Sequence, residues 1–530
     1  MRYGATGAPF AFKARRASRS HLPRMNTPPR FRSGALAAGL LLAARLTAAD
    51  SAAPVLPRAT PESQGISSAG LQAILDETDA RQFGMHSIMI VRHGKVVAEG
   101  WWAPYTATEP HMLFSLSKSF TSTAIGMLQS EGRLNIHDKL VSFFPGEAPA
   151  DASGNVKNMR LRDLLMMSTG QVKEDVDRLN DGLMGKADAT KQFFATPVPQ
   201  KPGTLFYYNS PATYLLSATV TKVTGQPVRD YLMPRLFEPL GIPTPDWDVS
   251  AQGYNHGASG LHLRTEEIAK FGQLLLQRGE WNGRRLVPAD WVDLATSRQA
   301  SNGSDPDGDW DQGYGFQFWR CVPGFYRADG AFGQFCIVMP QYDTVVAITG
   351  GTKDTKGVMK MLWRLLLPEL RPAPLPENPA AQAALRSRLA GLTLPVTSGS
   401  ATSSLAASVS GRKFVLEKND LGLESVTLAV AADGTVTFKA RRYDQDQSVV
   451  AGRGEWKPGE FRINRNGTPP VATSGAWTTD DTYTLRLTQL GQPFLETFRL
   501  KFAGDSVTLE RAMNVGGSSD QPVVLTGKAE

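Results

Sequence analysis

Residues 115–132 read SLSKSFTSTAIGMLQSEG, and this stretch carries both a helical pattern and a reactive pair of side chains. Four apolar residues recur at the three- and four-residue spacing of one helix face: Phe120, Ala124, Met127 and Leu128. The closing Glu131-Gly132 is typical of a helix end. The stretch therefore predicts a helix that begins near Ser115.

Ser115 and Lys118 lie one turn apart on such a helix, so the lysine can reach the serine. A serine hydroxyl is a weak nucleophile until a base takes its proton. A lysine acts as that base only where burial or nearby positive charge lowers its pKa. Because a helix start also directs free backbone N–H groups toward a developing oxyanion, the pair predicts a nucleophile and its base.

Two further segments carry polar groups beside glycines. Residues 202–210 combine a Pro-Gly-Thr turn with Tyr207, Tyr208, Asn209 and Ser210, directly before a helical pattern. A tyrosine phenol beside a lysine can relay a proton to a leaving group, although the two tyrosines could instead be core aromatics. Residues 328–334, ADGAFGQ, lead into a strand, and their glycines permit either close approach to a ligand or a plain hairpin turn.

The order of these segments resembles the serine β-lactamase-related family over about residues 59–367. This group includes class C β-lactamases, D-alanyl-D-alanine carboxypeptidases, family VIII esterases and 6-aminohexanoate-dimer hydrolases. The motifs that carry the resemblance follow in chain order: Glu62-Ser63-Gln64-Gly65-Ile66, Ser115 to Thr121, Leu161-Arg162-Asp163-Leu164-Leu165, Pro202-Gly203-Thr204, Tyr208-Asn209-Ser210, Gly260-Leu261, and Gly333-Gln334 followed by Pro340 and Asp343.

The resemblance implies a serine hydrolase that works through an acyl-enzyme without a cofactor or a metal. Ser115 would be the acylated nucleophile, Lys118 its base and Tyr208 the second acid/base group. The backbone N–H groups of Ser115 and Ala331 would form the oxyanion hole.

Substrate contacts are expected at Ser210, Gly330 and Gln334. The third motif of the family usually begins with Lys or His, and Ala328 stands in that place. Loss of this cation weakens the case for a β-lactam carboxylate, and the Gly-x-x-Gly-Gln arrangement is closer to the 6-aminohexanoate-hydrolase and esterase branch. Hydrolysis of a small-molecule ester or small amide is therefore favoured over β-lactamase or D-alanyl-D-alanine carboxypeptidase activity.

Strands at both ends of a mainly helical middle predict a mixed α+β domain over residues 54–370 with one antiparallel sheet. The resemblance implies that helices and a helical lobe flank this sheet. Proline-rich and then Ser/Ala/Thr-rich sequence predicts a linker over 371–409. Alternating apolar residues with Gly/Asp turns predict an all-β barrel or sandwich over 410–530, which resembles lipocalin-like appendages.

Residues 1–53 are expected to be an export signal, which would place the protein in the periplasm or outside the cell. The first 49 residues hold nine basic and no acidic residues, so the rest of the chain has 48 basic residues against 50 acidic ones. The formal net charge of +7 therefore belongs to the leader and does not indicate a nucleic-acid partner. No apolar run is long enough for a membrane span.

Cys321 and Cys336 are 15 residues apart. In an exported protein they could form a disulfide, and two isolated buried thiols are nearly as compatible with the pattern. No Gly-x-Ser-x-Gly motif occurs, and none of the seven histidines has an evident serine partner. His256 and His262, in a glycine-rich loop, fit a structural or solvated role better than a metal site.

A second class of function stays open from the sequence alone. The chain could be a catalytically inactive ligand-binding or cell-envelope protein in which the C-terminal β domain is the working part. The sequence makes no prediction of oligomeric state.

Overall fold

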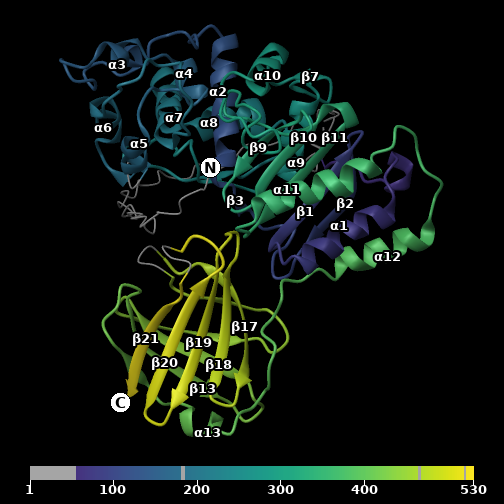
Figure 1. The fold of residues 1–530 in the computed structure, drawn as a ribbon, viewed down its shortest axis with the longest axis vertical. Helices are drawn as coiled ribbons and strands as arrows, with labels where there is room; N and C mark the ends of the chain where they lie inside the picture. Colours follow the sequence, from purple (N-terminus) through teal and green to yellow (C-terminus); the bar gives the residue numbers. More distant parts are fainter. Residues whose placement is uncertain (1–54, 181–184, 464–466, 518–520) are drawn as a thin grey trace, which may run out of the picture.

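The computed structural model describes residues 55–180, 185–463, 467–517 and 521–530, with a helix-and-sheet domain above a β-barrel (Figure 1). The predicted export leader, residues 1–53, lies outside the described residues and stays a prediction. Within the described ranges, no helix combines the length and apolar character needed to cross a membrane.

An antiparallel sheet forms the centre of the N-terminal domain. Among the described residues its six strands lie in the order β2-β1-β11-β10-β9-β8. Their bounds are β1 Met85–Arg92, β2 Lys95–Trp101, β8 Trp319–Arg320, β9 Tyr326–Gly330, β10 Gln334–Met339 and β11 Thr344–Gly350. β1, β10 and β11 are buried along their whole length, because helices cover both faces of the sheet.

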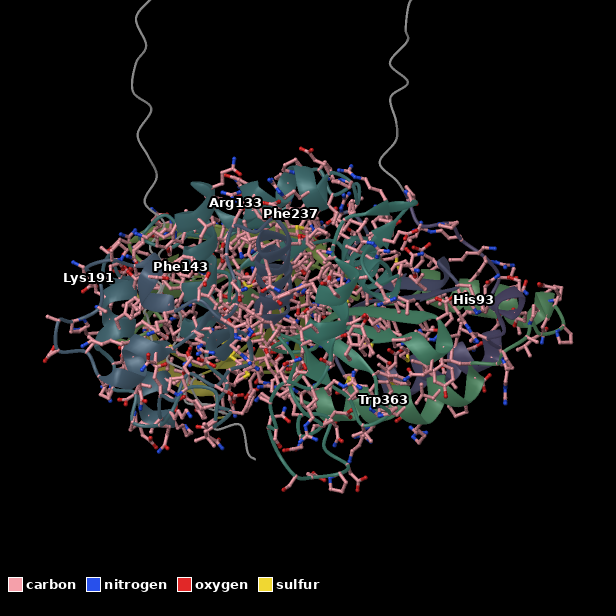
Figure 2. The ribbon with its side chains drawn as sticks, turned by 90° about the horizontal axis from the view of Figure 1, so that it is seen from above. His93, Arg133, Phe143, Lys191, Phe237 and Trp363 are labelled. Carbon is pink, nitrogen blue, oxygen red and sulfur yellow. The ribbon has the colours of Figure 1, made fainter. Side chains whose placement is uncertain are left out.

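One face of the sheet packs against helix α9 (Thr265–Leu276) and the helical lobe, and the other packs against α1 (Ser68–Ala80), α11 (Thr355–Met361) and α12 (Pro379–Ala390). The remaining helices are α2 Ser117–Ser130, α3 Gly154–Asn158, α4 Leu161–Leu165, α5 Lys173–Asn180, α6 Ala189–Ala195, α7 Ser210–Thr224, α8 Val228–Leu232, α10 Ala289–Thr296 and α13 Ala406–Val409. Figure 2 shows Phe143 and Lys191 at the lobe end and His93 and Trp363 at the sheet end.

The elements around the predicted reactive residues are confirmed. A short 3-10 turn, Phe114–Leu116, leads into α2, which ends at Ser130 with Gly132 in the left-handed region (φ 67°). The β1–β2 turn has φ of 50° at His93 and 71° at Gly94, as a two-residue hairpin of this twist requires.

Three short strands, β3 (His111–Met112), β5 (Leu261–Leu263) and β4 (Asp246–Trp247), form a second sheet. A two-stranded hairpin, β6 (Glu280–Trp281) and β7 (Arg284–Arg285), lies apart from both.

The predicted linker, residues 371–409, is wrong for part of its length. Helix α12 lies inside it and packs against α1 through the buried Leu385. Gln382 Nε2 donates a 2.8 Å hydrogen bond to Glu62 Oε2. Residues 379–390 therefore extend the N-terminal domain, and this packing was hidden by the proline-rich sequence before the helix.

The suggested disulfide between Cys321 and Cys336 is absent, and both thiols are free and buried. Cys336 belongs to the core on the α9 face of the sheet, whereas Cys321 belongs to the core on the α1 face. Because the sheet separates the two side chains, the alternative of two isolated thiols is the correct one.

The C-terminal domain is a nearly closed barrel. In the described residues its ten strands lie in the order β15-β14-β13-β12-β21-β20-β19-β18-β17-β16. The bounds are β12 Phe414–Leu416, β13 Leu423–Val430, β14 Val436–Arg442, β15 Gln445–Ala451, β16 Lys457–Glu460, β17 Pro470–Thr479, β18 Thr482–Gln489, β19 Leu495–Ala503, β20 Ser506–Met513 and β21 Val523–Ala529. Alternate side chains fill its interior, as the period-two pattern predicted.

Candidate active site

Ser115 and Lys118 approach each other at the start of α2, as their spacing predicted. Lys118 Nζ lies 3.1 Å from Ser115 Oγ and 3.0 Å from Ser210 Oγ, and it donates a 2.8 Å hydrogen bond to the carbonyl oxygen of Ala258. Ser115 is half-buried, whereas Lys118 is 1% exposed. The lysine thus joins three separate segments at one point.

Burial lowers the pKa of Lys118 from its ordinary value of 10.5 to about 7, because the charged ammonium loses its hydration. A large fraction of this amine is therefore neutral near pH 7, the form that can accept a proton. Burial of Lys118 therefore provides the lowered pKa that a lysine needs in order to act as a base.

The segment 207–210 reaches the same point because Asn209 caps α7. The Asn209 side chain accepts a hydrogen bond from the backbone N–H of Ala212, and its Nδ2 donates to Gln171 Oε1 at 2.7 Å. This cap places Ser210 beside the lysine and Tyr208 over it, with Lys118 Nζ 5.0 Å from the centroid of the Tyr208 ring.

Lys118, Tyr208 and Ser210 form what we call the polar wall beside Ser115. Tyr208 stacks on Trp319 with ring centroids 5.5 Å apart, which holds the phenol ring against β8. Ser210, predicted as a substrate contact, instead has its hydroxyl within hydrogen-bonding distance of Lys118. The neighbouring Tyr207 points elsewhere and donates to Asp177 Oδ1 at 3.2 Å.

The third segment approaches the turn that carries Ser115 through Gly330, at the end of β9. A Cβ on Gly330 would lie 2.1 Å from the carbonyl oxygen of Leu113, so only glycine lets the strand approach the turn before Ser115 this closely. Ala331 follows and is exposed. The contact brings β9, which ends one residue before Ala331, against the short turn that contains Ser115.

The predicted substrate contact at Gln334 is wrong. Its side chain is fully buried, with Nε2 donating to the carbonyl oxygens of Ala331 (3.0 Å) and Gly350 (2.8 Å) and Oε1 accepting from the Gly350 N–H (3.2 Å). These bonds use the amide to hold the turn that carries Ala331. Gln334 is therefore a positioning residue.

The sequence reasoning missed a buried ion pair next to this turn. Arg327 Nε lies 2.8 Å from Asp329 Oδ2, and Arg327 is fully buried with its guanidinium 4.5 Å from the Trp310 ring centroid. Burial raises the pKa of Asp329, and the neighbouring guanidinium opposes this shift. The two residues are two positions apart on β9, so strand alternation placed them on one face, opposite Ala328.

Among the described residues, no group of three or more His, Cys, Asp or Glu side chains is placed to hold a metal ion. His256 is buried, which lowers its pKa to about 4, and it lies near the sheet of β4 and β5. The sequence left a structural and a solvated role open for His256. Its burial fits the structural role and argues against the solvated one.

The three segments lie within a part of the chain that is similar to proteins of known families. The family model described as Beta-lactamase matches residues 71–369, which include all three segments. The chain is 25% identical over 329 residues to the 6-aminohexanoate-dimer hydrolase of Paenarthrobacter ureafaciens, a match that covers 58% of this chain and 81% of the relative. It is 26% identical over 303 residues to penicillin-binding protein 4 of Amycolatopsis lactamdurans, covering 50% of this chain and 77% of the relative.

Among solved structures, the octameric penicillin-binding protein homologue from Pyrococcus abyssi is similar with a TM-score of 0.47 and 17% sequence identity. That similarity covers 87% of this chain and 99% of the other.

Proposed function

The chain belongs to the beta-lactamase family, and from this premise we propose that it is a serine hydrolase that cleaves an ester or a small amide through an acyl-enzyme on Ser115. The observation that carries the proposal is the position of Lys118 Nζ, 3.1 Å from Ser115 Oγ, together with the pKa of about 7 that burial confers on it. A neutral amine at this distance can take the serine proton.

In the proposed reaction, Ser115 Oγ attacks the carbonyl carbon of the substrate while Lys118 Nζ takes the hydroxyl proton. The resulting oxyanion is stabilised by the backbone N–H groups of Ser115 and Ala331. The C–O or C–N bond to the leaving group then breaks, and Tyr208 and Lys118 return the proton to the leaving group. Water attacks the acyl-enzyme, releases the acid and restores the proton on Ser115.

Two observations favour a small ester or amide over a β-lactam. Ala328 occupies the place where related third motifs carry Lys or His, and it is buried in the core. Arg327, the cation next to it in the chain, is paired with Asp329 on the opposite face of β9. A relative named for hydrolysis of a linear amide dimer supports the amide possibility.

The test combines labelling with turnover. An activated ester should acylate Ser115 in the full chain, as detected by mass spectrometry of the digested protein, and Ser115→Ala should remove both labelling and hydrolysis. Ser130→Ala, at the far end of the same helix, is the matched control and should keep both. The turnover panel contains short p-nitrophenyl esters, nitrocefin, D-alanyl peptides and linear amide oligomers.

Retained hydrolysis by Ser115→Ala, with Ser115 unlabelled in the native protein, would contradict the proposal. Absence of turnover on the whole panel would instead favour the ligand-binding alternative.

A further inference from the structure

The barrel reaches the candidate active site through the loop between β18 and β19. Phe494 in this loop lies with its ring centroid 6.3 Å from that of Phe114 and 6.1 Å from that of Phe332, and the last two are 5.3 Å apart. Phe114 directly precedes Ser115, and Phe332 directly follows Ala331. We call these three residues the phenylalanine wall.

Hydrogen bonds anchor this loop on both sides of Phe494. The Met112 N–H donates to the carbonyl oxygen of Gly491 at 2.9 Å, and Tyr105 Oη donates to the carbonyl oxygen of Gln492 at 2.8 Å. On the other side, the Leu495 N–H donates to Asn514 Oδ1 at 2.8 Å, and Asn514 Nδ2 donates to the carbonyl oxygens of Gly351 (2.9 Å) and Pro493 (2.8 Å). The loop is thus tied to β3 and to the end of β11.

Three glycines make room for this contact. A Cβ on Gly351 would lie 2.3 Å from the carbonyl oxygen of Pro493, and one on Gly491 would lie 2.7 Å from that of Pro110. A Cβ on Gly516 would lie 2.6 Å from the Phe494 ring. Glycines on both domains therefore allow the loop and its phenylalanine to sit in this position.

The two phenylalanines of the N-terminal domain have unusual backbones. Phe114 has φ of 48° and Phe332 has φ of 67°, in the left-handed region that L side chains rarely adopt. Such conformations persist only where contacts with the surrounding structure hold them in place, and they are common at functional sites. Here they turn the two rings toward each other and toward Phe494.

We propose that the C-terminal barrel supplies Phe494 as a specificity-determining residue, completing an apolar surface for the uncharged acyl chain of the substrate beside Ser115. The three rings are each half-buried, so part of the wall remains open to a ligand. The inference rests on the proposed serine hydrolase function and adds the substrate class: esters or amides of apolar acids, with the apolar chain against the phenylalanine wall.

The experiment compares p-nitrophenyl hexanoate with p-nitrophenyl acetate in the full chain. The hexanoate has four more methylenes, and loss of contact with two of them corresponds to about a tenfold loss. In Phe494→Ala, we expect the ratio of kcat/KM for hexanoate over acetate to fall about tenfold, chiefly through KM. Phe494→Leu, which keeps an apolar side chain, should hold the ratio within about threefold of the native value.

Trp456→Phe is the matched control. Trp456 is another half-buried aromatic residue of the barrel at the domain boundary, where its Nε1 donates to the carbonyl oxygen of Leu394. If Phe494 acted only by holding the two domains together, Trp456→Phe and Phe494→Ala would each change kcat/KM for hexanoate and for acetate by the same factor. An unchanged hexanoate-to-acetate ratio in Phe494→Ala would overturn the inference while leaving Ser115 acylation intact, whereas an unlabelled Ser115 in the native protein would overturn the proposed function itself.

Discussion

The polar wall and the phenylalanine wall border Ser115, yet they are built in different ways. Lys118, Tyr208 and Ser210 all come from the N-terminal domain, and the lysine is held by partners at 2.8 to 3.1 Å. The phenylalanine wall draws on both domains and is held by ring packing. Two of its residues carry backbone strain on the order of 1–3 kcal/mol each.

This difference indicates which part of the molecule can supply a buried base and which part can supply an apolar surface. Burial lowers the pKa of Lys118, and the interior of one domain provides this burial. An apolar surface needs only shape and contact, so an appended domain can contribute to it. On this basis, changes to the polar wall should alter the rate for every substrate, and changes to the phenylalanine wall should alter the choice among substrates.

The largest effect is expected for Lys118→Met, which removes the base while keeping a long side chain. We expect kcat to fall about 10³-fold for acetate and hexanoate esters alike, because proton removal from Ser115 is common to both. The measurement is steady-state hydrolysis, with Lys270→Met as the control because Lys270 is also buried but lies on α9. A loss of less than tenfold would show that another group is the base.

A second prediction concerns the support beneath the barrel loop. His86 Nδ1 lies 3.0 Å from His111 Nε2, and Tyr105, which holds the loop, stacks on His86. Burial is the main cause that lowers the pKa of His111 from 6.5 to about 4; the backbone hydrogen bond to Met112 opposes this shift, and His262 nearby contributes to it. Because the unfolded chain takes up this proton first, the free energy of unfolding should fall between pH 6.5 and 4, by about 3 kcal/mol.

Urea unfolding at a series of pH values measures this loss, with a plateau above pH 6.5. His111→Asn, which has no titrating ring, should show a smaller loss between pH 6.5 and 4. The same slope in both proteins would assign the acid sensitivity to other groups, such as His256.

The pH dependence of activity tests the polar wall separately. The neutral form of Lys118 is the proposed base and its pKa is about 7, so kcat/KM should rise about tenfold per pH unit below 7 and level off above it. The profile should be the same for acetate and hexanoate. A profile flat from pH 5 to 8, measured where the protein stays folded, would contradict the assignment.

Ser210→Ala should have a moderate effect. Its hydroxyl lies 3.0 Å from Lys118 Nζ, so its loss leaves the amine less well oriented, and we expect kcat to fall about tenfold. Ser210→Thr retains the hydroxyl and should recover most of the rate. Equal rates in the alanine variant and the native protein would remove Ser210 from the polar wall.

The smallest effect is expected from reducing agents. Cys321 and Cys336 are free thiols on opposite faces of the sheet, so neither wall depends on a disulfide. Dithiothreitol should change Tm by less than about 1 °C, because no cross-link is lost. A drop of several degrees would mean that the thiols pair.

Features carried by local spacing were predictable from the sequence. The approach of Lys118 to Ser115 follows from one helical turn, and the His93-Gly94 hairpin follows from a two-residue turn. The strand expected after residues 328–334 is β10, and the all-β pattern over 410–530 is the barrel. The helix α12 was missed because its preceding prolines dominate the composition of that region.

By itself, the sequence determined the approach of Lys118 to Ser115, the mixed domain and the all-β domain, since each depends on residues close together in the chain. Only the tertiary structure decided that Gln334 supports a turn, that the two thiols are kept apart, and that Phe494 meets Phe114 and Phe332. The physical reason is that burial and long-range packing depend on how distant segments fold together, and no local pattern records which loop of the barrel will meet Phe114 and Phe332.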